Sequence, residues 1–125
     1  MNPDEFEDAL IEHLAALQAR DVERFAATLG DDVTVVDGRG TITTGREAVV
    51  HAHAEWFATA DAWSFDYAVR LSRDCGTAAF ALIDVTYRQT ADAEPARFLL
   101  SLFFEREPGG AWKFVYDQNT ALAAS

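Results

Sequence analysis

The stretch Trp112-Lys113-Phe114-Val115-Tyr116-Asp117-Gln118-Asn119-Thr120 decides how the rest of the chain is interpreted. It begins with aromatic and β-branched residues, which favour a strand in a core, and it runs into an acid, two amides and a hydroxyl. We therefore predict the central strand of a curved sheet, whose polar end lies at the mouth of whatever the sheet encloses. Strand alternation places Asp117 and Asn119 on one face and Gln118 on the other, unless a bulge intervenes.

Length and composition predict one domain. The chain has 125 residues, half of them hydrophobic, which is enough for a single sizeable core. It has no apolar run of about 18 residues, and its first residues are acidic where a signal peptide is basic, so we expect a cytoplasmic protein. The single cysteine, Cys75, cannot form an internal disulfide and fits a reducing compartment.

The charge excludes two classes of partner. Ten basic against 21 acidic residues give a net charge of −11, which repels nucleic-acid phosphates and anionic membranes. His51 and His53 lack the spacing of helical metal ligands, and the sequence contains no phosphate loop, nucleophile elbow, zinc spacing or dinucleotide fingerprint. We therefore expect no nucleic acid, membrane, metal or cofactor.

The first half predicts three helices around a small hairpin. Residues 4–19 form the first helix, with Phe6, Leu10, His13, Leu14 and Leu17 at helical spacing. Asp21 caps a second helix over 22–29, which Gly30 ends. Strands 32–37 and 41–44 flank a turn at 38–40, and Thr44 with Glu47 predicts a capping box for a third helix over 45–60.

The second half predicts four long antiparallel strands: 63–71, 77–89, 96–107 and the closing stretch from Trp112. Strand 96–107 is apolar on both faces. The helices cover one face of the sheet, and large apolar surfaces are seldom left in water. We therefore expect a homodimer through the other face of the sheet.

Three stretches carry a resemblance to a known family. Residues 9–21 are similar to a first helix followed by a charged corner, Gly45-Arg46-Glu47-Ala48-Val49 to the start of a third helix, and residues 112–120 to the ending W-x-x-x-x-D-Q-N-T. This order resembles the nuclear transport factor 2-like superfamily and its SnoaL-like and SgcJ-like members, over essentially the whole chain. The resemblance implies an α+β cone-shaped fold: three N-terminal helices packed on a strongly curved antiparallel sheet that encloses a pocket.

The resemblance does not specify one reaction, because the superfamily includes isomerases, cyclases, dehydratases and association domains. In its isomerases and cyclases a carboxylate moves a proton next to a carbonyl, and a donor stabilises the enolate. The isomerases have a tyrosine on the first helix, where this chain has only His13. Our catalytic candidates are Asp117, His53 and Asp37, and our ligand-binding candidates are His13, Trp56, Trp63, Tyr67, Tyr87, Gln118 and Asn119.

Each candidate also has a purely structural interpretation. Asp37 suits a turn, Asp84 can pair with Arg88 or Arg97 on the sheet surface, and His13 suits a core. Which of Asp37, Asp84 and Asp117 faces the pocket therefore stays open.

Two functions remain. The first is a dimeric pocket protein that binds a small hydrophobic molecule, with cofactor-independent isomerisation, cyclisation or hydrolysis as its chemistry if it is an enzyme. The second is a non-catalytic association module. An enclosed cavity lined by His53, Asp117 and aromatic rings favours the first, whereas a cavity filled by those side chains favours the second.

Overall fold

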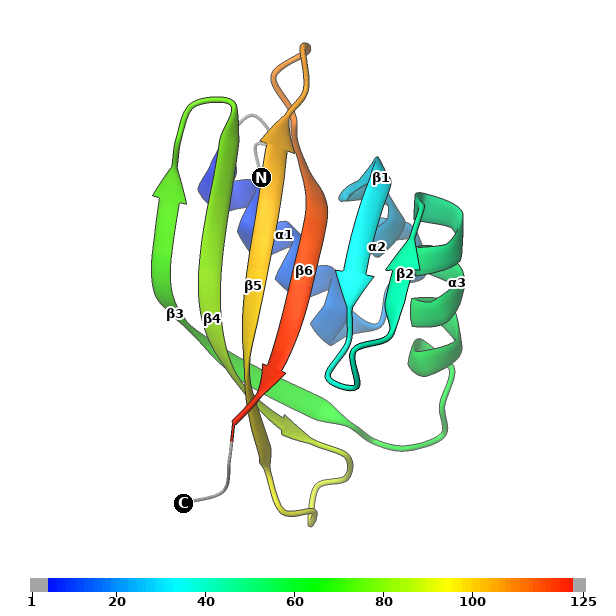
Figure 1. The fold of residues 1–125 in the computed structure, drawn as a ribbon. Helices are drawn as coiled ribbons and strands as arrows, with labels where there is room; N and C mark the ends of the chain where they lie inside the picture. Colours follow the sequence, from blue (N-terminus) through cyan, green and yellow to red (C-terminus); the bar gives the residue numbers. More distant parts are fainter. Residues whose placement is uncertain (1–4, 123–125) are drawn as a thin grey trace.

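The computed structural model describes residues 5–122, which form three helices and six strands (Figure 1). The predicted helix start at Pro3 and Asp4 lies outside the described residues. No helix within residues 5–122 is long and apolar enough to cross a membrane. The elements in chain order are α1 (Phe6–Ala19), α2 (Val22–Ala27), β1 (Leu29–Val36), β2 (Ile42–Thr44), α3 (Arg46–Phe57), β3 (Ser64–Asp74), β4 (Ala78–Arg88), β5 (Ala96–Arg106) and β6 (Trp112–Ala121).

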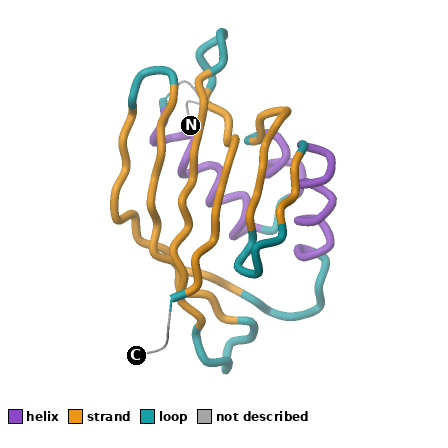
Figure 2. The backbone as a smooth tube through the Cα atoms, in the orientation of Figure 1, coloured by secondary structure: helices purple, strands orange, loops and turns teal. Residues whose placement is uncertain are grey.

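The strands form one curved sheet in the order β2-β1-β6-β5-β4-β3. Figures 1 and 2 show α1 running behind the sheet and α3 beside β2, so the helices cover one face, which we call the inner face. This is the α+β arrangement expected from the sequence, with one difference. The last strand, β6, is central as predicted, between the β1–β2 hairpin and the β3–β5 meander, but it pairs with β1 in parallel.

Two predicted features next to the hairpin are wrong. Helix α2 starts at its predicted cap, Asp21, but ends at Ala27, and Leu29 already pairs with Phe114 in the sheet. Helix α3 follows Gly45, whose φ of 98° favours glycine, and no side chain caps it. The proposed cap, Thr44, belongs to β2. Strand pairing overrides the local helix signals at both places: Leu29 pairs with the distant Phe114, and Thr44 pairs with Thr34 within the hairpin.

A bulge in β6 reverses the strand alternation. The pairing with β5 shifts between Phe114 and Tyr116, so Val115 is the extra residue. Phe114 and Asp117 consequently both face the helices, although strict alternation would put them on opposite faces. The neighbouring strand accommodates the bulge at Gly30, where a Cβ would lie only 3.1 Å from Val115 Cγ1.

The inner face has a filled part and a hollow part. In the filled part α1 packs through Phe6, whose ring centroid lies 5.4 Å from that of Phe104. His13 is also buried there, and its ring stacks on Phe114 at 4.1 Å. Burial, together with a smaller contribution from the nearby His53, lowers the pKa of His13 to about 3. The hollow part lies beyond these rings, between α3 and the far ends of the strands.

Candidate functional site

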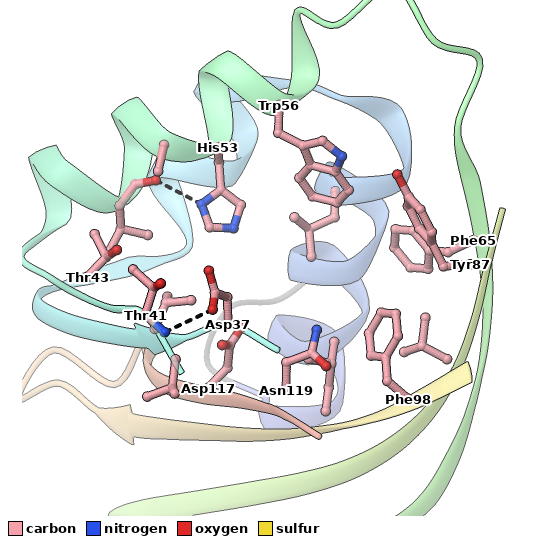
Figure 3. A pocket seen from close by; sticks show the side chains of 17 residues that line it. Asp37, Thr41, Thr43, His53, Trp56, Phe65, Tyr87, Phe98, Asp117 and Asn119 are labelled. Atoms are coloured by element: carbon pink, nitrogen blue, oxygen red, sulfur yellow. Dashed lines mark hydrogen bonds between the residues drawn. The ribbon is translucent and has the colours of Figure 1, made fainter. Parts of the chain in front are cut away.

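The hollow part of the inner face is a cavity of about 430 Å³ (Figure 3). Helix α3 forms one wall, and β6 with the end of β1 lies opposite. Figure 3 shows polar side chains gathered at one end and aromatic side chains at the other. The lining residues are Leu17, Val35, Val36, Asp37, Thr41, Thr43, Val49, Ala52, His53, Trp56, Phe65, Val85, Tyr87, Phe98, Leu100, Asp117 and Asn119.

Asp117 is the half-buried acid of the polar end. Its side chain borders the cavity, and no residue among 5–122 forms a hydrogen bond or ion pair with its carboxyl group. Burial raises the pKa of Asp117 to about 7, because the ionised form loses its hydration. Near neutral pH the group therefore exists in both forms, so it can accept a proton and give it back.

His53 faces the cavity from α3. Its Nδ1 donates a hydrogen bond to the carbonyl oxygen of Val49 at 2.8 Å, which fixes the tautomer and leaves Nε2 as an acceptor. The ring stacks on Phe25 at 4.4 Å. Burial lowers the pKa of His53, and the bond to Val49 only partly opposes this. The imidazole is therefore neutral at neutral pH.

Asp37 lies at the rim of the polar end, directly after β1, and is exposed. Its Oδ1 accepts backbone hydrogen bonds from Arg39 at 2.9 Å and Thr41 at 3.0 Å. Figure 3 shows the other carboxyl oxygen pointing toward the ring of His53. The turn interpretation and the site interpretation of Asp37 therefore both hold geometrically, one for each oxygen.

The opposite end of the cavity presents aromatic faces. Trp56, Phe65, Tyr87 and Phe98 line it (Figure 3). The hydroxyl of Tyr87 donates to Gln89 Oε1 at 2.8 Å, so it is engaged outside the cavity lining. This end therefore offers an apolar surface for a ring system, and the hydrogen-bonding groups lie at the other end.

Four of the ligand-binding candidates do not line the cavity. His13 belongs to the core, where its Nδ1 donates to Thr28 Oγ1 at 2.8 Å, since the Thr28 hydroxyl itself donates to a carbonyl. Trp63 lies behind Trp56, and their rings stack at 4.1 Å. Tyr67 packs half-buried against the core, and Gln118 is exposed on the outer face.

Asp84 faces away from the cavity. Its Oδ2 lies 2.7 Å from Arg97 and 3.2 Å from Arg70 on the outer face of the sheet. The predicted pairing with Arg97 is confirmed, whereas Arg88 donates to a backbone carbonyl instead. Of the three aspartates left open by the sequence, Asp37 and Asp117 line the cavity and Asp84 does not.

Sequence reasoning missed several lining residues. Thr41 and Thr43 contribute hydroxyls beside Asp37, and Phe98 and Leu100 contribute apolar wall from β5. The register would have identified the last two, because Phe98 pairs with Val85 and so shares its face. No three His, Cys, Asp or Glu side chains within residues 5–122 lie close enough together to hold a metal ion.

Comparisons with known proteins agree on the fold. The SnoaL-like domain family matches residues 7–123. No curated protein matches the chain. A ketosteroid isomerase-like protein from Erwinia carotovora atroseptica has a TM-score of 0.79 at 18% identity, with 94% of each chain covered.

Two further solved structures carry other descriptions. One is provisionally assigned as a calcium/calmodulin-dependent protein kinase type II association domain from Thiobacillus denitrificans, with a TM-score of 0.83, 19% identity and 94% of each chain covered. The other is provisionally assigned as a dehydratase from Streptomyces avermitilis, with a TM-score of 0.79, 14% identity and coverage of 95% and 94%.

At these identities the structural likeness establishes the fold alone, and the three descriptions differ. The family match, in contrast, covers nearly the whole chain. The chain therefore belongs to the SnoaL-like domain family.

Proposed function

We propose that this chain binds a small, largely apolar organic molecule and catalyses a cofactor-independent proton transfer on it. The observation that carries the proposal is the carboxyl group of Asp117, which borders a mostly apolar cavity and has no hydrogen-bonding partner within residues 5–122. An acid that faces a mostly apolar cavity and has no protein partner contributes little to the fold, so a role toward a ligand explains its presence.

The geometry suits isomerisation next to a carbonyl. The Asp117 carboxylate removes a proton from the carbon beside the carbonyl, and the electron pair of that C–H bond moves to the carbonyl oxygen as an enolate. Figure 3 shows the amide nitrogen of Asn119 pointing into the cavity, where it can donate a hydrogen bond to the enolate oxygen. In a β,γ-unsaturated carbonyl compound the enolate is conjugated with the double bond, so the protonated Asp117 can return the proton to the γ carbon while the double bond moves next to the carbonyl and the carbonyl re-forms.

His53 supports this chemistry as a neutral group. Its Nε2 accepts a hydrogen bond from a substrate hydroxyl or from a water molecule, and its lowered pKa keeps a second charge out of the cavity. The ring system of the substrate packs against Trp56 and Tyr87 at the aromatic end.

Asp117→Asn tests the proton-transfer role. Aromatic polyketides, steroids and short carbonyl compounds are first screened for binding by thermal shift, and the hits are then assayed by NMR for exchange of the proton beside the carbonyl. Loss of a general base lowers the rate by about 100-fold or more, so we expect that loss in the variant. Asp66→Asn, at an exposed position of β3 that does not line the cavity, removes the same charge and serves as the control. An unchanged rate in Asp117→Asn contradicts the proposal.

A second candidate function, self-association, is favoured by the outer face of the sheet. Phe103 is 41% exposed there, and its ring lies 5.9 Å from Phe80 and 5.7 Å from Tyr116. The nearby Asp84 is neutralised by two arginines, although the chain as a whole is strongly acidic. Two copies that meet on this face remove Phe103 and the rings beside it from water. We propose a homodimer through this face, which is compatible with a ligand cavity on the inner face.

Sedimentation velocity at micromolar concentration tests the homodimer. We expect a dimer for the native chain and a monomer for Phe103→Glu, because the substitution places a charge in the centre of the apolar patch. Ile42→Glu makes the same chemical change on β2, at the far edge of the sheet, where Ile42 is 66% exposed, and should leave the dimer intact. A monomeric native chain overturns the dimer and leaves the pocket proposal standing.

A further inference from the structure

We propose that the cavity selects organic cations: its preferred ligand has an aromatic body and a protonated amine, and the amine contacts Asp37 at the rim. The inference rests on the small-molecule pocket proposed above, and it adds the charge class of the ligand to that proposal.

The first argument is the charge of the cavity lining. The titratable lining groups are Asp37, His53, Tyr87 and Asp117, and the lining includes no Lys or Arg. His53 is held neutral, and the hydroxyl of Tyr87 is bonded to Gln89. The only charge that the lining can present is therefore negative. A carboxylate or phosphate ligand would lose its hydration there and gain no counter-charge.

The second argument is the geometry of Asp37. Two backbone N–H groups, from Arg39 and Thr41, bind one carboxyl oxygen and hold the group in place. The other oxygen points over the cavity toward His53 (Figure 3). No side chain within residues 5–122 forms an ion pair with Asp37, so a ligand ammonium group would be its first cationic partner. A preorganised carboxylate of this kind loses little freedom when it binds an amine.

The third argument comes from Asp117, deeper in the same cavity. Its half-buried carboxyl group borders the cavity and has no hydrogen-bond partner within the described residues, which points independently to a ligand at this end. Ligand N–H donors that reach past Asp37 would meet this second acceptor. Two acids in one cavity mouth favour a donor-rich, positively charged head group over a neutral one.

The aromatic end completes the match. The faces of Trp56, Phe65, Tyr87 and Phe98 accommodate the ring system of the ligand, while its amine lies at the opposite, polar end. The ring of Trp63 stacks on that of Trp56, and the guanidinium carbon of Arg20 lies 4.1 Å from the centroid of the Trp63 ring. These contacts hold Trp56 in place. The net charge of −11 also raises the local concentration of cations around the molecule.

Three ligands with the same ring system test the charge preference: naphthylmethylamine, naphthylmethanol and naphthoate. Binding is measured by isothermal titration calorimetry at neutral pH and low salt. We expect the amine to bind about tenfold more tightly than the alcohol, and the carboxylate to bind more weakly than both. Equal affinity for amine and alcohol, or tighter binding of the carboxylate, overturns the charge preference but leaves the pocket proposal intact. If none of the three ligands binds, both proposals fail.

Asp37→Asn assigns the preference to one residue. The amide oxygen of asparagine can still accept the two backbone hydrogen bonds of the turn, so the fold of the rim is retained. We expect the amine to lose its advantage while the alcohol binds as before. Asp66→Asn, with the same charge change outside the cavity, should keep the advantage. A variant Asp37→Asn that still prefers the amine overturns the assignment.

Discussion

The inward-facing residues at the start and at the end of β6 lie on the same side of the sheet but have different roles. Near its start, Trp112 and Phe114 are almost fully buried against α1. Past the bulge at Val115, Asp117 and Asn119 line a cavity. The difference shows that one strand can complete a hydrophobic core with its first residues and line a cavity with its last residues. Where helix α1 packs closely the strand supplies rings, and where the helices leave space it supplies polar groups.

The polar groups near the two halves differ in whether they have a hydrogen-bond partner. His13, in the filled half, has a hydrogen-bond partner in Thr28. Asp117, in the hollow half, has none within residues 5–122. A core normally satisfies its polar groups, so the unsatisfied acid marks the half of the strand that serves something other than folding.

The largest expected effect on stability is in the filled half. Phe114→Ala removes a ring that stacks on His13 and contacts Phe104, and it should lower the free energy of unfolding by about 4 kcal/mol. Urea denaturation measures this loss. Asn119→Ala, on the same face in the hollow half, should cost less than about 1 kcal/mol, because its side chain borders a cavity. Equal losses for the two variants would break the comparison.

The next effect is on stability as well, but it is a gain: Asp117→Asn should make the chain more stable than the native one as the pH rises. The folded chain keeps a proton on Asp117 up to about pH 7, whereas an unfolded aspartate releases it near its ordinary value. Stability of the native chain therefore falls as the pH rises from about 4 to about 7. The variant Asp117→Asn has no titratable group at this position, so its stability does not fall for this reason.

The variant should thus gain about 2 to 3 kcal/mol over the native chain when the pH is raised from about 5 to about 8. Denaturant titrations of both proteins at the two pH values measure this difference, which cancels the contributions of His13 and His53. A difference that does not change with pH would show that Asp117 is an ordinary, hydrated acid.

The smallest expected effect is that of a substitution at Gln118, which lies between Asp117 and Asn119 in the sequence. Gln118 points outward, where it accepts a hydrogen bond from the hydroxyl of Tyr116 at 2.8 Å. Gln118→Ala should change the free energy of unfolding by less than about 0.5 kcal/mol and leave ligand affinity unchanged. Loss of ligand binding in this variant would mean that the orientation of the strand end is different from the one described.

Much of the fold could be predicted from local patterns. The helical spacing of Leu10, Leu14 and Leu17 correctly indicates the face of α1 that packs on the sheet. The alternation in β4 separates the inward Ile83 and Val85 from the outward Asp84. These features depend on a few neighbouring residues, and burial of one face is enough to specify them.

The candidate site was predicted less completely. Trp56 and Tyr87 line the cavity as expected, but Trp63 lies one layer behind and Tyr67 packs on the core. All four are aromatic residues that the sequence offers as ligand-binding candidates, so composition cannot distinguish them. The distance of each residue from the hollow part of the inner face decides, and that distance depends on how the sheet bends.

The sequence by itself determined the helical and strand periods, the family and the polar ending of β6. Only the tertiary structure decided that Asp117 shares a face with Phe114, because the bulge at Val115 reverses the alternation. It also placed Leu29 beside Phe114, although the local signal was helical. Local sequence fixes a period, whereas register and bulges are fixed by contacts between segments far apart in the chain.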